Sequence, residues 1–166
     1  MSIAKRALIF ARRAHESVGQ LRRYTSQPYI VHPVNVANIV KSVRHTPEMI
    51  AAAYLHDVIE DCGITSAQVH AEFGPAVGEL VDWLTDVSTP ADGTRAARKR
   101  LDREHLAAAP AEAQTIKMAD LIDNTMSIRD RDPDFWRVYR AEKLLLLEVM
   151  TRGDRTLHAR AAALCE

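Results

Sequence analysis

A chain of 166 residues with 47% apolar content is long enough to bury a core as one domain, which excludes an intrinsically disordered protein. Lys plus Arg and Asp plus Glu number 22 each, so net charge excludes a general attraction to nucleic acid or membrane, and an anionic substrate must be held by local charge. Aromatic residues make up only 5% and glycine is scarce, a mixture that favours helices over sheets.

The features that would indicate export or membrane insertion are missing from the sequence. The N-terminal residues lead into an amphipathic pattern, unlike the apolar core of a signal peptide. No apolar run approaches the roughly 20 residues that a membrane-spanning helix needs. The two cysteines, Cys62 and Cys165, are more typical of reduced thiols than of a disulfide framework. We therefore expect a soluble, cytoplasmic protein.

Residues 3–17 predict a first amphipathic helix, because small and apolar residues recur there at helical spacing. These residues are Ala4, Ala7, Leu8, Ala11 and Ala14. Gly19 ends that helix, and a loop bounded by Pro28 and Pro33 leads to a second one. Since Pro33 suits the first turn of a helix, His32 is expected at the helix entrance, where its side chain can be aimed at a fixed point.

A third helix is predicted to start at Thr46, with a cap, a proline and a first-turn acid, and to stop near Gly63. Its last turns carry a histidine and three carboxylates within six residues, namely His56, Asp57, Glu60 and Asp61. Such groups are costly near a core unless they are paired or bind a metal ion. An acidic helix face explains the last two well. It explains the adjacent His-Asp pair poorly, because such neighbours converge best on something held between them.

The middle of the chain predicts two short helices, a loop and a basic helix. Thr65 begins a capping box for a short helix that ends near Gly74, and Pro75 begins another. Residues 88–94 are the clearest loop, and the basic run 95–103 follows it. A solvated helix face is the preferred interpretation of this run. The functional alternative is a positive wall beside an anionic ligand.

The last third of the chain predicts three further helices. Pro110 opens a long one that reaches beyond Asn124, Pro133 starts the next, and Asp154 starts the last. No stretch alternates as a strand over more than a few residues, and no repeat or linker divides the chain. The sequence therefore predicts one all-α domain over residues 1–166, a bundle of eight or nine helices.

Four residues that suit a metal site come from different helices or helix entrances, namely His32, the adjacent His56 and Asp57, and Asp120. Asp120 interrupts an apolar helical run, and Asn124 lies one turn further on the same face. Taken singly, each has an ordinary explanation as a helix-end polar residue or the partner of an arginine. Taken together, two imidazoles and two carboxylates suit a borderline divalent ion such as Mn²⁺, Fe²⁺ or Zn²⁺ with open coordination positions.

This order of histidines and aspartates on helices resembles the HD-domain metal phosphohydrolases. The local sequence is more specifically similar to the hydrolase domain of RelA/SpoT-type proteins, above all to stand-alone small alarmone hydrolases, which include the metazoan SpoT homologues. The similar segments are Ala14-His15 with Gly19-Gln20, residues 28–33, residues 56–61, Phe73-Gly74, and residues 117–120 with Asn124. The resemblance covers residues 4–150, and motifs in the same order are far more specific than His-Asp alone.

The resemblance implies a (p)ppGpp 3′-pyrophosphohydrolase that depends on a divalent metal ion, usually Mn²⁺. His32, His56, Asp57 and Asp120 match the metal ligands, and Glu60 and Asp61 match the acidic pair beside the metal. A bound ion activates a water molecule at neutral pH and polarises a phosphoryl oxygen. Glu60, one turn from the His-Asp pair, can orient or deprotonate that water as a general base. Asp61 can share that role or help protonate the departing 3′-oxygen.

The resemblance also implies contacts to the substrate. Arg23 matches the family's guanine-contacting arginine when counted back from His32, whereas Arg22 matches when counted forward from Gly19-Gln20. Tyr24-Thr25-Ser26 stands where the family usually has a glycine, so the nucleobase pocket differs in shape. The other candidate contacts are Asn124, Ser127 and Tyr139, the last of which can equally be a helix-packing aromatic beside Trp136.

A second departure lies in the family's usual Asp-Arg-Leu-His-Asn, which is here Asp120-Leu121-Ile122-Asp123-Asn124. The lost arginine and the gained Asp123 change the charge beside the site, which indicates a less anionic or differently placed substrate. One alternative is therefore an HD enzyme that acts on another nucleotide, such as a 2′-phosphatase of NADPH. Another is a binding module that senses an alarmone without turnover, although the complete set of ligands and acids counts against it.

In every case we expect a small nucleotide as the partner, with no nucleic acid and no membrane. The sequence leaves homo-oligomer formation open. It does not support a RelA-type synthetase or a C-terminal regulatory domain.

Overall fold

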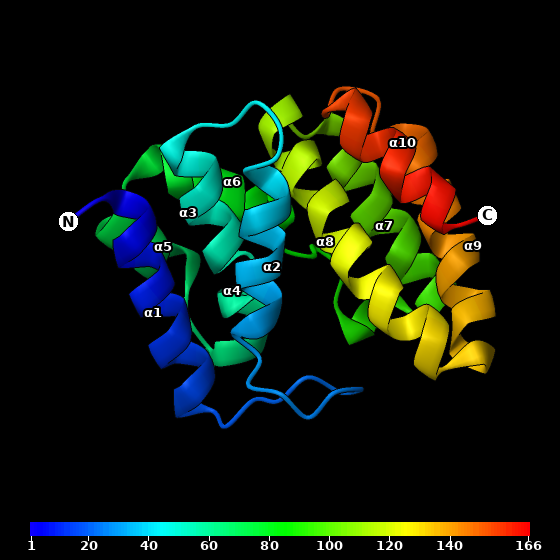
Figure 1. Cartoon of the computed structure of the whole chain (residues 1–166), viewed down its shortest axis with the longest axis horizontal. Coiled ribbons are helices and arrows are strands. Elements are labelled where there is room, and N and C mark those ends of the chain that lie inside the picture. The colour runs from blue at the N-terminus through cyan, green and yellow to red at the C-terminus, as the bar shows by residue number, and fades with distance from the viewer.

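Ten α-helices and one short 3₁₀ helix form the structure, a computed structural model that describes residues 1–166 (Figure 1). In chain order they are α1 (Ile3–Ser17), α2 (Val31–Val40), α3 (Pro47–Leu55), α4 (Val58–Cys62), α5 (Ser66–Phe73), α6 (Pro75–Leu84), η1 (Pro90–Asp92), α7 (Arg95–Ala108), α8 (Ala111–Arg131), α9 (Pro133–Val149) and α10 (Arg155–Leu164). The only strand-like pairing is an isolated bridge between Leu21 and Pro28. The prediction of an all-α single domain is confirmed.

The third predicted helix is divided in two in the structure. α3 ends at Leu55 and α4 begins at Val58, because the backbone of Asp57 (φ −104°, ψ −3°) leaves the helical path. When α3 and α4 are counted together the helices number nine, the upper value expected from the sequence. The break has a consequence for the site, since it allows the side chains of His56 and Asp57 to turn toward one point.

Most helix starts lie where the capping residues predict them. The Thr46 hydroxyl accepts a hydrogen bond from the Met49 N–H at 3.2 Å, and Thr65 and Gln68 form both bonds of a capping box. α2 begins at Val31, slightly earlier than Pro33 indicates. His32 therefore lies in the first turn of α2, at the helix entrance as expected.

The centre of the core is formed by α3 and α8. The last seven residues of α3, Met49–Leu55, are all buried, so this helix has almost no solvent face. Ala7 and Ala11 are fully buried and let α1 approach α3 closely. α8 contacts α2, α3, α6, α9 and α10. Each large apolar side chain contributes about 1.5–3 kcal/mol to the stability of the fold when it is fully buried. The packed core therefore holds the helices that carry the predicted metal ligands in fixed positions.

The helices are arranged around a seam between α2 and α8. In Figure 1, α1, α3 and α5 lie on one side of the molecule and α7, α9 and α10 on the other, with α2 and α8 side by side between them. The segment of residues 18–30 runs along one end of the molecule and leads into α2. No helix combines the length and apolarity needed to cross a bilayer.

Candidate metal centre

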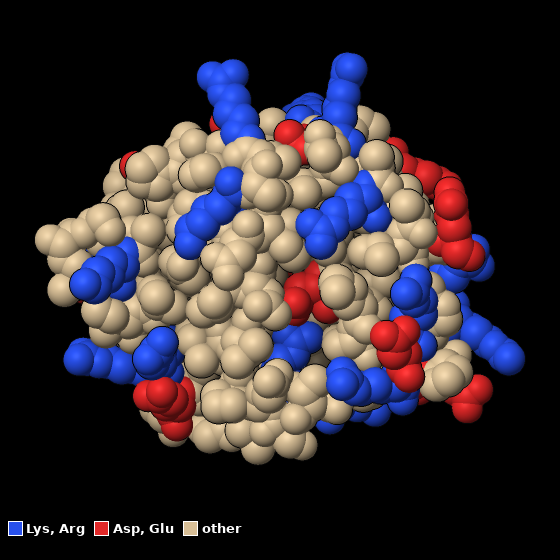
Figure 2. Space-filling view, viewed as in Figure 1, with Lys and Arg blue, Asp and Glu red and all other residues tan.

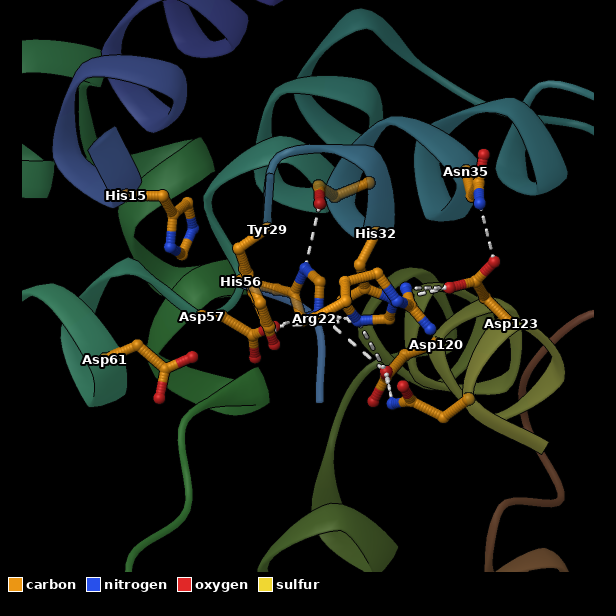
Figure 3. Close-up of polar contacts among 12 residues, drawn as sticks. His15, Arg22, Tyr29, His32, Asn35, His56, Asp57, Asp61, Asp120 and Asp123 are labelled. Carbon is orange, nitrogen blue, oxygen red and sulfur yellow. Dashed lines mark hydrogen bonds and ion pairs between the residues drawn. The ribbon is translucent and has the colours of Figure 1, made fainter. Parts of the chain in front are cut away.

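Three of the four side chains predicted as metal ligands, His32, His56 and Asp57, place donor atoms within 4.8 Å of one another between α2 and the α3–α4 break, and Asp120 of α8 approaches both imidazoles (Figure 3). The two imidazole Nε2 atoms, of His32 and His56, are 3.2 Å apart. Asp57 Oδ2 lies 3.0 Å from the Nε2 of His56 and 3.6 Å from that of His32. Asp120 Oδ1 lies 3.2 Å from the Nε2 of His32 and 3.8 Å from that of His56. We refer to these four residues as the His/Asp cluster.

Each imidazole of the His/Asp cluster is oriented by a hydrogen bond at its other nitrogen. The Nδ1 of His56 lies 2.9 Å from the carbonyl oxygen of Ala53, which can only accept a hydrogen bond. The Nδ1 of His32 lies 2.6 Å from Oδ2 of Asp123, which accepts when ionised. Both protons are therefore fixed on Nδ1 in the neutral rings, and both Nε2 lone pairs face the same spot.

This donor set fits a divalent cation. Two nitrogen lone pairs and two carboxylate oxygens repel one another at these separations unless a positive charge lies among them. Donor atoms that share one ion at about 2.0–2.2 Å are separated by roughly 3–3.6 Å, close to the distances found here. The mixture of imidazole and carboxylate suits Mn²⁺, Fe²⁺ or Zn²⁺, in agreement with the expectation from the sequence.

Protons take the place of the cation when no ion is bound. Burial lowers the pKa of His32, but the hydrogen-bonded carboxylates of Asp120 and Asp123 outweigh burial and raise the pKa to about 9. Burial also opposes ionisation of Asp57, yet the charge of His56 holds the pKa of Asp57 well below its usual range. A divalent ion would therefore displace protons from the imidazoles as it binds.

Further polar contacts hold the two carboxylates of the cluster. Lys117 Nζ lies 2.8 Å from Asp120 Oδ2, and Asn124 donates its side-chain N–H to Asp120 Oδ1 at 2.7 Å. Tyr29 donates its hydroxyl hydrogen to Asp57 Oδ2 at 2.7 Å. The amide of the predicted substrate contact Asn124 is thus engaged with the cluster itself.

The two acids predicted as catalytic lie in different surroundings. Glu60 Oε1 accepts the backbone N–H of Asp86 at 2.7 Å, and its carboxylate lines a cavity of about 80 Å³ together with Lys117. Although Glu60 as a whole residue is exposed, partial loss of hydration at its carboxylate, followed by the charge of Asp86, raises the pKa of Glu60 to about 7. Asp61 is instead turned toward the first loop, where its Oδ2 accepts from Gln20 Nε2 at 2.9 Å.

Of the two candidate arginines, Arg22 is the one that reaches the site. Its NH1 lies 2.5 Å from Asp123 Oδ2, and its NH2 donates to Ser127 Oγ at 3.0 Å. Arg23 is exposed, with its guanidinium 5.4 Å from the centre of the Tyr24 ring. The structure therefore brings Arg22 and Ser127 together beside the cluster and leaves Arg23 outside it.

Tyr139 lies in an aromatic packing environment. Only 6% of the residue is exposed, and its ring centre lies 6.0 Å from that of Phe135 and 6.1 Å from that of Trp136. This is the surrounding expected for a helix-packing aromatic, the alternative that the sequence left open.

The basic run on α7 is divided between the protein surface and a cavity beside Glu60. Arg98 and Lys99 line a cavity of about 370 Å³ that also contains the carboxylate of Glu60, whereas Arg100 pairs with Glu104 at the surface. On the face shown in Figure 2, basic and acidic side chains are interspersed, in keeping with the balanced composition. Part of the run is thus a solvated face, the preferred interpretation, and on the cavity side Lys99 is paired with Asp86 and Asp102.

Three residues that contact the His/Asp cluster were not predicted as site residues from the sequence, namely Tyr29, Lys117 and Asp123. Tyr29 and Lys117 lie within recognised motifs, and Asp123 appeared only as an unusual charge. The available signal was helical spacing, because Lys117, Asp120 and Asp123 are each three residues apart and share one face of α8. Nothing local indicates that Asp123 meets His32, since the two are far apart in the chain.

Comparison with known proteins identifies the family. A family profile described as "HD domain" matches residues 7–145. The human protein named guanosine-3′,5′-bis(diphosphate) 3′-pyrophosphohydrolase MESH1 is 33% identical over 138 residues, which are 81% of this chain and 74% of that protein. A solved structure, described as a metazoan ortholog of SpoT that hydrolyzes ppGpp, superposes with a TM-score of 0.86 at 27% identity and covers 99% of this chain and 94% of that one.

A bacterial protein from Vibrio cholerae, named guanosine-3′,5′-bis(diphosphate) 3′-pyrophosphohydrolase, is 47% identical over 81 residues. These are 49% of this chain but only 11% of that protein, and other bacterial relatives are matched over no more than 20% of their length. The fold, the profile and the similarity along most of MESH1 agree with one another. The chain belongs to the HD domain family and is related to the ppGpp 3′-pyrophosphohydrolases, with a MESH1-like fold.

Proposed function

We propose that this protein is a metal-dependent phosphohydrolase that removes pyrophosphate from the 3′ position of ppGpp or pppGpp, and that the HD-type domain comprises residues 1–166. The observation that carries the proposal is the convergence of two imidazole Nε2 atoms and two carboxylates in the His/Asp cluster. The names of the relatives, among them the human and V. cholerae proteins, support the choice of substrate. Two free cysteines agree with a cytoplasmic location.

In this proposal His32, His56, Asp57 and Asp120 hold a divalent ion, most simply Mn²⁺. Such an ion supplies an activated water and withdraws charge from a phosphoryl oxygen. Glu60 accepts the proton of the attacking water, a role for which a pKa of about 7 is well suited. Asp61 assists by orienting water or by protonating the departing 3′-oxygen.

The cavity beside Glu60 provides local charge for an anionic substrate. Lys117 and Lys143 line its inner part, and Lys99 and Arg98 line its outer part. Asp86, Asp102 and Glu142 share this lining, and Lys99 and Lys117 are each paired with an aspartate, so in this proposal a polyphosphate reaches the basic side chains by displacing carboxylates from them.

Of the predicted nucleotide contacts, Arg22 and Ser127 are proposed to meet the substrate, because they lie beside the cluster. Asn124 is engaged with Asp120, Tyr139 packs among aromatic side chains, and Arg23 lies outside the cluster.

A second candidate substrate is NADPH, from which the same centre would remove the 2′-phosphate. The contact that favours it is the ion pair of Arg22 with Asp123 at 2.5 Å, which occupies an arginine that would otherwise meet the guanine base. The residue that replaces the family's other arginine, Leu121, is 2% exposed and offers no charge to the site. A binding module without turnover is the third alternative.

A substrate panel tests the proposal. Purified protein loaded with Mn²⁺ is incubated with ppGpp, pppGpp, NADPH and simple nucleotides, and released pyrophosphate and phosphate are measured separately. We expect pyrophosphate from ppGpp, no release from Asp57→Ala, and normal release from Asp130→Ala, a control that removes an exposed aspartate of α8. Phosphate from NADPH alone would transfer the assignment to the second candidate. Mn²⁺ binding without turnover of any nucleotide would exclude both hydrolase assignments and favour the third alternative, a binding module.

A further inference from the structure

We propose that Asp123 is a positioning residue that aims the Nε2 atom of His32 into the His/Asp cluster and thereby sets the affinity for the metal ion. The inference rests on the metal site of the proposed function, but it requires no particular substrate. Asp123 is not one of the four predicted ligands, and its carboxylate faces the opposite edge of the His32 ring, as Figure 3 shows.

Both oxygens of the Asp123 carboxylate are engaged. Oδ2 lies 2.6 Å from His32 Nδ1 and 2.5 Å from Arg22 NH1, and Oδ1 accepts the side-chain N–H of Asn35 at 2.8 Å. Only 9% of the residue is exposed. A carboxylate held by three neighbours cannot turn away, so it fixes both the ring plane and the tautomer of His32.

The two imidazoles of the cluster are therefore not equivalent. The Nδ1–H of His56 points to a neutral carbonyl oxygen, whereas the Nδ1–H of His32 points to a charged carboxylate. A carboxylate partner makes the far nitrogen a stronger donor to a metal ion, and loss of such partners typically weakens metal binding about 10–100-fold. His32 is thus the imidazole whose binding strength the protein adjusts.

Arg22 gives this arrangement a second property. Its guanidinium balances the charge of Asp123, so the carboxylate supports His32 without adding a full negative charge beside the nucleotide site.

The test measures Mn²⁺ binding to metal-free protein by titration calorimetry, without any nucleotide. We expect Asp123→Ala to raise the Kd about 10–100-fold, and Asp123→Asn, which keeps an oxygen acceptor but loses the charge, to raise it less. Asp130→Ala on the same helix is the matched control and should leave the Kd unchanged. Since Asp123→Ala can also disturb the fold, circular dichroism and thermal unfolding in EDTA accompany each titration, and Asp123→Asn is the decisive variant if Asp123→Ala unfolds.

A spectroscopic measurement separates positioning from a merely structural role. In Co²⁺-loaded protein the visible absorption bands report the ligands directly, and Asp123→Asn should shift them while the exposed control Asp130→Ala should not. A folded Asp123→Asn variant with wild-type Kd and wild-type bands would overturn the inference, and so would wild-type protein that binds no Mn²⁺. Wild-type protein that binds Mn²⁺ in an Asp123-dependent way but hydrolyses no nucleotide would overturn the proposed function alone.

Discussion

Among the acids of the site, Glu60 combines a raised pKa with a cavity that a reacting group can enter. Its carboxylate is held by the backbone N–H of Asp86, and loss of hydration together with the charge of Asp86 raises the pKa to about 7. A general base acts only when it is deprotonated, so the reaction rate should rise through pH 7, where it is half-maximal, and level off about one pH unit above. The sign is the opposite of that expected for a general acid.

The corresponding prediction concerns Glu60→Gln. We expect kcat to fall about 10²–10⁴-fold, the usual contribution of a general base, while the Kd for Mn²⁺ stays unchanged because Glu60 is not part of the His/Asp cluster. The rising limb near pH 7 in the profile of kcat/KM should disappear in the variant. The measurements are steady-state kinetics from pH 5 to 9 and a metal titration. A variant with the full wild-type rate would remove Glu60 from the mechanism.

Substitution of the two neighbouring arginines, Arg22 and Arg23, should have different effects on KM. Arg22 is paired with Asp123 and Ser127 beside the cluster, whereas Arg23 is exposed and stacks on Tyr24. We expect Arg22→Ala to raise KM about 10-fold or more, the loss typical of a hydrogen bond to a charged group, and Arg23→Ala to change KM less than about twofold. Steady-state kinetics on both variants decide between them. A large effect for Arg23 alone would favour the alignment counted back from His32.

The sequence was sufficient to predict the residues of the His/Asp cluster but not to choose between Arg22 and Arg23, and the reason is physical. His32, His56, Asp57 and Asp120 are polar groups in apolar helical surroundings, where burial without a partner or an ion would be costly. Their residue type and their position in apolar helical segments were therefore enough to indicate a shared site. The loop of residues 18–30 has no periodicity to fix its register, so counting forward from Gly19-Gln20 and back from His32 left two assignments for the arginine. The contact of Asp123 with His32 depends on the packing of α2 against α8, which no local pattern specifies.

At the scale of single elements, helix caps were predictable and the α3–α4 break was not. Thr46 and Thr65 mark helix starts by side-chain hydrogen bonds within one turn. The break at Asp57 occurs without a glycine or a proline, the residues that usually interrupt a helix. Contacts from other elements meet the chain at this point, such as the hydrogen bond from Tyr29 to the Asp57 carboxylate. The helix that the sequence predicts as continuous is thus interrupted at His56 and Asp57, two residues of the His/Asp cluster.

The packing of α5 against α6 gives a prediction for stability. Gly78 is buried in α6, and a Cβ atom there would lie 2.5 Å from the Cγ and Cδ2 atoms of the His70 ring, which is held by a 2.8 Å contact with Asp82. We expect Gly78→Ala to destabilise the protein by about 1–3 kcal/mol through overpacking, despite the better helix propensity of alanine. Urea unfolding measures the change.

The control for this prediction is the double variant with His70→Ala, in which the obstructing ring is gone. There the substitution Gly78→Ala should become neutral or stabilising by about 1 kcal/mol, the helix-propensity difference. If Gly78→Ala stabilises the protein that retains His70, the ring moves aside readily and the α5–α6 contact is looser than the structure indicates.

For the whole molecule, the His/Asp cluster joins segments that are distant in the chain. Its ligands come from α2, from the α3–α4 break and from α8, and these elements lie on both sides of the seam between the N-terminal and C-terminal helices. An ion bound only by the folded protein therefore stabilises the entire domain, because unfolding any one of these elements releases it. Without the ion, the same groups must hold protons to relieve their mutual repulsion.

Removal of the ion should accordingly lower the melting temperature. At an ion concentration of about 100 times the Kd, binding contributes about 2.7 kcal/mol, and a domain of this size shifts by about 2–4 °C per kcal/mol. We expect EDTA to lower the Tm of Mn²⁺-saturated protein by about 5–10 °C, and Mn²⁺ to leave the Tm of Asp57→Ala unchanged. Scanning calorimetry with and without Mn²⁺ measures both. An equal shift in wild type and Asp57→Ala would mean that the ion binds elsewhere, because the two proteins differ only in a ligand of the cluster.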